Sequence, residues 1–202
     1  RVDDWDNIMI AYCNGNREYE GKTIAEITEQ KRIDPYDFVF DLLIQEKASV
    51  AIVIFTMCEK DMRAVLKHPA SMIGSDSSST APYGVLAKGK PHPRTYGTFP
   101  RILGEYVRRK KLLTLEDAIR KMASFPAQKL RLKDRGLIRK GMWADITVFN
   151  PEKIADRATY LKPHQYPVGI EYVIVNGKLV IADGKHTRQL PGKALRLQTS
   201  NK

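Results

Sequence analysis

The chain has 202 residues, 43% hydrophobic and 28% charged, which is typical of an ordinary soluble globular protein with its own core. No apolar run reaches the ~18 residues of a membrane span and the first residues do not resemble a signal peptide, so we expect a cytoplasmic protein without a membrane anchor. The two cysteines, Cys13 and Cys58, lie too far apart in the sequence for a disulfide framework or a zinc knuckle, and we interpret both as buried free thiols.

The net charge of +11 is concentrated in two segments. Residues 101–140 contain thirteen Lys or Arg against four acids, and residues 185–202 contain five bases and no acid. Such a balance is compatible with nucleic-acid binding. Aromatic residues are not interleaved with the bases, however, and no nucleic-acid-binding signature is present. A solvated helical face is therefore the better interpretation, and we do not expect a nucleic-acid partner.

The first 70 residues alternate between strand and helix patterns. An apolar run predicts a strand at 8–13, a capping box predicts a helix at 23–31, and an Asp-Pro pair predicts a second helix from residue 34. The β-branched run at 50–55 predicts a strand buried on both faces, as in a parallel sheet, and a further helix is expected at 59–67. This alternation is typical of α/β architecture.

A short apolar run that ends at an acid follows these elements. The sequence Ser-Met-Ile-Gly-Ser-Asp at 71–76 predicts a strand at 72–76 with Asp76 at its C-terminal end, before a polar loop at 77–90. In α/β barrels the catalytic groups lie at the C-terminal ends of strands and on the loops that follow them. Asp76 is therefore a candidate catalytic residue, and a turn or helix cap is the alternative role for it.

The second half changes from helices to antiparallel strands. Capping residues and prolines predict helices that begin near residues 98, 114 and 124. Alternating hydrophobicity predicts a strand at 144–149, and an Asn-Gly pair predicts a hairpin with a type I′ turn at 173–182. The tail beyond residue 186 has no lasting periodicity.

Three motifs carry a resemblance to a known family. Gly-Ser-Asp at 74–76, Pro-His-Pro-Arg at 91–94 and Gly-Thr-Phe-Pro-Arg at 97–101 together resemble the C-terminal part of N-acyl-D-amino-acid deacylases, also called D-aminoacylases. These enzymes belong to the amidohydrolase superfamily. The run at 136–146 resembles that superfamily's C-terminal signature, where the chain leaves a barrel and adds strands to a small β-sandwich.

The resemblance implies an α/β fold made of the C-terminal part of a TIM-type (β/α)8 amidohydrolase barrel, followed by strands of a small β-sandwich. It places the last barrel strands and helices at 1–135, the sandwich strands at 136–186 and a basic tail at 187–202. A full barrel needs ~250 residues, more than this chain has. We therefore expect a missing N-terminal portion of the enzyme to be its partner.

The implied activity is metal-dependent hydrolysis of the amide bond of N-acyl-D-amino acids. The family binds its metal, typically zinc, through a His-x-His pair, a cysteine and further histidines upstream of the part that this chain resembles. We expect zinc in the complete enzyme, no metal ligand in this chain, and no activity from the chain alone. The chain's histidines, which show neither a His-x-His nor a His-Glu-x-x-His pattern, are His68, His92, His164 and His186.

The resemblance also implies site residues. Asp76 would take a proton from metal-bound water and pass it to the leaving nitrogen, and Arg94 would bind the α-carboxylate of the substrate. Met57 is a plausible wall for an apolar substrate side chain, with core filling as the alternative. Arg94 has the alternative role of an ordinary surface arginine. We assign no catalytic role to His92, for which a structural role is as good an interpretation.

Other functions remain open at this point. The loop at 77–90 is longer than the family's, which leaves the substrate undecided, because loops shape the pocket while strand ends carry the chemistry. A related amidohydrolase acting on cyclic amides, such as a dihydroorotase or hydantoinase, is one alternative. A non-catalytic basic binding module is the other. Strands without barrel neighbours would also expose apolar edges, so a homo-oligomer is possible.

Overall fold

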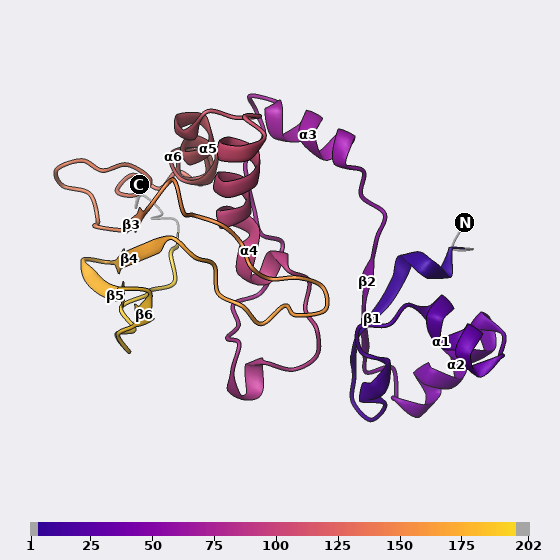
Figure 1. Ribbon diagram of the computed structural model, residues 1–202. Helices are drawn as coiled ribbons and strands as arrows, with labels where there is room; N and C mark the ends of the chain where they lie inside the picture. Colours follow the sequence, from indigo (N-terminus) through magenta and orange to yellow (C-terminus); the bar gives the residue numbers. More distant parts are fainter. Residues whose placement is uncertain (1–3, 197–202) are drawn as a thin grey trace, which may run out of the picture. The chain divides into compact units, whose positions relative to one another are not determined.

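The computed structural model describes residues 4–196, which divide into two compact units (Figure 1). The first unit contains the chain up to Glu59, Asp76–Tyr96 and Arg157–Tyr166, and the second contains Lys60–Ser75, Gly97–Asp156 and the chain from Pro167 onward. The domain boundaries expected at 135 and 186 stay a prediction. The part of the tail beyond residue 196 lies outside the described residues.

The first unit packs two helices against a two-stranded sheet (Figure 1). Its elements are η1 (Trp5–Asn7), β1 (Ile8–Cys13), η2 (Arg17–Tyr19), α1 (Ile24–Lys31), α2 (Pro35–Gln45), β2 (Val50–Ile54) and η3 (Gly84–Leu86). The predicted capping box is confirmed, because Thr23 Oγ1 accepts from the amide of Glu26 and a Glu26 carboxylate oxygen accepts from the amide of Thr23. Asp34 likewise caps α2, which has Pro35 in its first turn.

The strand expected at 50–55 forms, but the prediction that both of its faces are buried in a parallel sheet was wrong. β2 pairs antiparallel with β1, from Ile8 opposite Ile54 to Cys13 opposite Val50. Val53 is buried, whereas Ile52 and Ile54 are 47% and 51% exposed. A β-branched run indicates a strand without specifying the direction of its neighbour or what covers its second face.

We predict that the isolated chain self-associates through this uncovered face of β2. Ile52 and Ile54 present an apolar row on a strand with one neighbour among the described residues, and such strands recruit further strands. Light scattering should give a mass above that of one chain. Ile52→Lys should lower that mass, and a monodisperse monomer from the unsubstituted chain would contradict the prediction.

The second unit combines helices with a four-stranded antiparallel sheet in the order β3-β4-β5-β6. Its elements are α3 (Glu59–Lys67), the π-helix η4 (Ile102–Arg109), α5 (Leu115–Met122), α6 (Ser124–Lys129), β3 (Ile146–Phe149), β4 (Ile170–Val175), β5 (Lys178–Ala182) and β6 (Lys185–His186). The boundary between the units falls within α4 (Arg94–Arg101), whose first three residues belong to the first unit. The hairpin prediction is confirmed, since Asn176 and Gly177 join β4 to β5 with φ values of 49° and 78°. No closed barrel forms among residues 4–196.

The segment 72–76 forms no strand and has no strand partner among the described residues, so the strand predicted there was wrong. Ile73 is instead buried in the core of the second unit with Ile102, Leu103 and Tyr106. Its amide donates to the carbonyl of Lys121 at 3.1 Å. The apolar pattern of this segment reflects packing against helices rather than pairing in a sheet.

The two cysteines lie in different environments. Cys13 is fully buried, as predicted, and burial together with nearby Glu46 raises the pKa of its thiol to about 11. Cys58, also predicted to be buried, is exposed, because it follows β2 on a segment that is largely uncovered. Across residues 4–196, no helix is long and apolar enough to cross a membrane.

Glu46 ties the end of α2 to the turn after β1. Its carboxylate accepts from the amides of Gly15 (2.8 Å) and Asn16 (2.9 Å) and from Asn16 Nδ2 (2.7 Å). These hydrogen bonds, led by the one from Gly15, hold the pKa of Glu46 below its ordinary value. A lowered pKa means that the stabilisation is complete above the unfolded-state pKa and is lost as the pH falls through the folded-state value.

Glu46→Gln should therefore destabilise the chain near pH 7 and have less effect near pH 3, where a larger share of the native carboxyl is protonated than at pH 7. Urea unfolding at both pH values measures the difference. Glu29→Gln, on the exposed surface of α1, is the matched control and should leave the pH dependence unchanged. An equal loss of stability at both pH values for Glu46→Gln would contradict the assignment.

Candidate active site

Two of the predicted site residues lie against each other in the first unit. Arg94 Nη2 is 2.9 Å from Asp76 Oδ2, and the two side chains are 44% and 85% exposed. The segments that carry them are joined a second time, because the hydroxyls of Ser77 and Thr95 are 2.7 Å apart. These two contacts join the two ends of the 77–93 loop. They also bring together Asp76, the candidate proton acceptor, and Arg94, the candidate binding residue for the substrate carboxylate.

Asp76 has a left-handed backbone conformation. Its φ of 47° lies in the left-handed region, which few residues other than glycine adopt, and which aspartate tolerates better than most. Such conformations recur at functional positions, where the surroundings hold them in place. Asp76 thus follows the packed segment that contains Ile73, and the polar loop begins directly after it.

Arg94 was expected in a loop, but it is the first residue of α4. The start of this helix is organised by His92, whose Nδ1 accepts from the amide of Arg94 at 3.0 Å and whose carbonyl accepts from the amide of Thr95 at 3.0 Å. The helix predicted from residue 98 therefore begins four residues earlier. A side chain on a helical first turn is held more firmly than one on an open loop.

The surroundings of His92 favour its neutral imidazole. Burial, and then the charge of Arg94, lower the pKa of its imidazole, while Asp76 acts in the opposite direction. Since Nδ1 accepts a hydrogen bond, the ring proton lies on Nε2, which is 3.2 Å from Tyr160 Oη. Tyr160 in turn packs edge-on against Phe55 at 4.8 Å between ring centroids. His92 thus makes structural contacts on both of its ring nitrogens.

Sequence reasoning did not single out Tyr160. It lies 68 residues after His92 in a segment without regular structure, and no motif or periodicity marks it. Met57 lies on the extended chain that follows β2, with 83% of its surface exposed. Met57 is therefore not part of the hydrophobic core of the described residues, and its contact with the substrate stays a prediction.

The described side chains do not form a metal site of their own. Within residues 4–196, no group of three or more His, Cys, Asp or Glu side chains is placed to hold one. The site described by these residues is a carboxylate beside a guanidinium. A carboxylate can accept and return a proton, and a planar guanidinium can bind another carboxylate through two parallel hydrogen bonds.

The chain belongs to the amidohydrolase family, whose sequence model matches residues 2–181. Within that family it is similar to the N-acyl-D-glutamate deacylase of Alcaligenes xylosoxydans xylosoxydans, with 36% identity over 200 residues that cover 99% of this chain and 38% of the relative. It is also 34% identical over 187 residues to the D-aminoacylase of the same organism, which covers 93% of this chain and 36% of that enzyme.

Solved structures of similar enzymes align with the chain in space. A D-aminoacylase structure matches with a TM-score of 0.78 and 37% identity over 90% of this chain and 36% of that one. An N-acyl-D-glutamate deacylase from Bordetella bronchiseptica, complexed with zinc and a phosphonate inhibitor, matches with a TM-score of 0.78 and 35% identity over 92% of this chain and 38% of that one. The chain therefore spans little more than a third of the length of these relatives.

Proposed function

We propose that this chain is the C-terminal portion of an enzyme that hydrolyses the amide bond of N-acyl-D-amino acids, giving a free D-amino acid and a carboxylate. The names and the sequence similarity of its relatives support the proposal. In this proposal residues 1–135 contribute the last strands and helices of a (β/α)8 barrel, and residues 136–186 contribute strands of a small sandwich.

The observation that carries the proposal is the contact between Asp76 and Arg94. In an N-acyl amino acid, a single carbon atom separates the carboxylate from the amide nitrogen. An anchor for the carboxylate and a base that serves the amide must therefore lie close together, as these two side chains do. Asp76 would take a proton from the attacking water and return it to the leaving nitrogen, and Arg94 would bind the α-carboxylate. Met57 would contact the substrate side chain.

A metal ion, zinc by analogy with the inhibitor complex, is part of the proposal, with ligands in the portion of the enzyme outside this chain. The isolated chain should then be inactive. Adding the N-terminal portion, as a separate chain or in one polypeptide, should give activity on N-acetyl-D-amino acids and much less on their L enantiomers.

The choice of substrates in this assay separates the proposal from its rivals. Preferential turnover of dihydroorotate or hydantoins would favour a cyclic-amide hydrolase. No turnover, together with tight and strongly salt-dependent binding of DNA or RNA, would favour a basic binding module. Turnover by the isolated chain, with contaminating enzyme excluded, would contradict the division of the site between two portions.

A further inference from the structure

The helix α5 carries a lysine that is completely buried. Lys121 has 0% of its surface exposed, although lysine is among the residues least often found inside proteins. Its Nζ donates to the carbonyl of His68, to Ser71 Oγ at 3.0 Å and to the carbonyl of Ser71 at 3.3 Å. Three acceptors match the three donors of the ammonium group, which is the condition for burying it.

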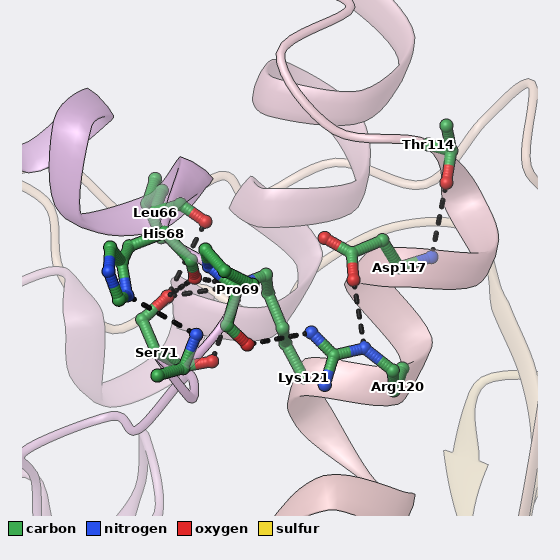
Figure 2. A network of polar contacts seen from close by, with 9 residues as sticks. Leu66, His68, Pro69, Ser71, Thr114, Asp117, Arg120 and Lys121 are labelled. Atoms are coloured by element: carbon green, nitrogen blue, oxygen red, sulfur yellow. Dashed lines mark hydrogen bonds and ion pairs between the residues drawn. The ribbon is translucent and has the colours of Figure 1, made fainter.

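Figure 2 shows this network, in which Lys121 reaches from α5 to the turn that follows α3. Carbonyls beyond the end of a helix carry partial negative charge, so a cation is favourable at this place. Nη2 of the neighbouring Arg120 donates a hydrogen bond to the carbonyl of Pro69 at 3.0 Å, and Nε of Arg120 donates one to Asp117 Oδ1 at 2.9 Å. We call residues 68–73 the anchored segment.

Lys121 holds the anchored segment through both its side chain and its backbone carbonyl. The ammonium group binds its first part, and the carbonyl of Lys121 accepts from the amide of Ile73 at its end. The side chain of Ile73 is buried in the core. At Gly74 the packing stops, since a side chain there would meet nothing within 4 Å. Ile73 is thus the last buried residue before Asp76, and the three residues of chain from Ile73 to Asp76 span at most ~10 Å.

We propose that Lys121 is a positioning residue for Asp76. By fixing the anchored segment to α5, it holds the chain at Ile73, three residues before Asp76, and so limits how far that carboxylate can move. This inference rests on the proposed function, in which Asp76 is the base. Small displacements of a reacting group have large effects on rate, on the order of 10²-fold for ~1 Å.

The test uses Lys121→Met in the complete enzyme, which keeps the bulk of the side chain and removes its hydrogen bonds. We expect kcat to fall about 10- to 100-fold, KM to change less than twofold and the metal content to stay the same. Ala118→Gly is the matched control, since it weakens α5 at another fully buried position without removing a hydrogen bond to the anchored segment. It should lower the melting temperature and leave kcat unchanged.

Two further variants keep the inference open to refutation. If Lys121→Met does not fold, Ser71→Ala is the deciding variant, because it removes one acceptor of the ammonium group. Its kcat should fall about 3- to 10-fold, and an unchanged kcat would overturn the inference. A kcat loss in Lys121→Met no larger than in Ala118→Gly would overturn it as well. Asp76→Asn is assayed alongside. Full activity in that variant would refute the proposed function itself, whatever Lys121→Met does.

Discussion

Asp76→Asn is expected to lower kcat of the complete enzyme by about 10²- to 10⁴-fold, the usual contribution of a general acid–base residue. The amide has nearly the shape of the carboxylate but cannot accept the proton of the attacking water. The metal content should stay nearly the same, because the proposal places the metal ligands elsewhere. Steady-state kinetics and metal analysis on the same preparations check both statements.

The exposure of Asp76 makes this test clean. Its side chain is 85% exposed in the chain and its ion pair with Arg94 is at the surface, so the substitution should remove little stability. Ser77→Ala, at the adjacent position, removes the hydroxyl contact with Thr95 and serves as the control for disturbing the loop. A kcat within tenfold of the native value in Asp76→Asn would exclude Asp76 as the base.

Elements that depend on local chemistry could be predicted from the sequence. The capping box at Thr23 and Glu26 and the Asn176-Gly177 hairpin each act within a few residues, so their signals are complete in a short window. The candidate site was found in the same way, through short motifs that end at Asp76 and Arg94. Their 2.9 Å contact is consistent with that choice, while their roles stay predictions.

Features that depend on distant partners could not be predicted. The direction of β2 is set by β1, some 40 residues earlier, and the hydrogen-bond partner of His92 Nε2 is Tyr160, 68 residues later. Lys121 had been counted among the bases of a solvated helical face, yet it is buried. Its position three residues after the buried Ala118 was a signal that it shares the inner face of α5.

Arg94→Ala is expected to raise KM for N-acyl-D-amino acids about 10- to 100-fold, with a smaller effect on kcat. A charge-assisted hydrogen bond contributes ~1.5–3 kcal/mol, and tenfold in affinity corresponds to ~1.4 kcal/mol. The loss should be confined to substrates that carry the α-carboxylate. N-acyl amines without a carboxylate provide the comparison, and their weaker turnover should be nearly the same in the variant and the native enzyme.

Arg94→Lys separates charge from geometry at this position. Lysine keeps the charge but cannot form two parallel bonds to a carboxylate, so KM should fall between those of the native enzyme and Arg94→Ala. Because Arg94 begins α4 and pairs with Asp76, a structural role would reduce turnover of both substrate classes alike. An equal loss of turnover for both substrate classes would exclude Arg94 as the residue that binds the substrate carboxylate. A loss restricted to carboxylate-bearing substrates would support that role, and it would also explain why Arg94 lies beside Asp76.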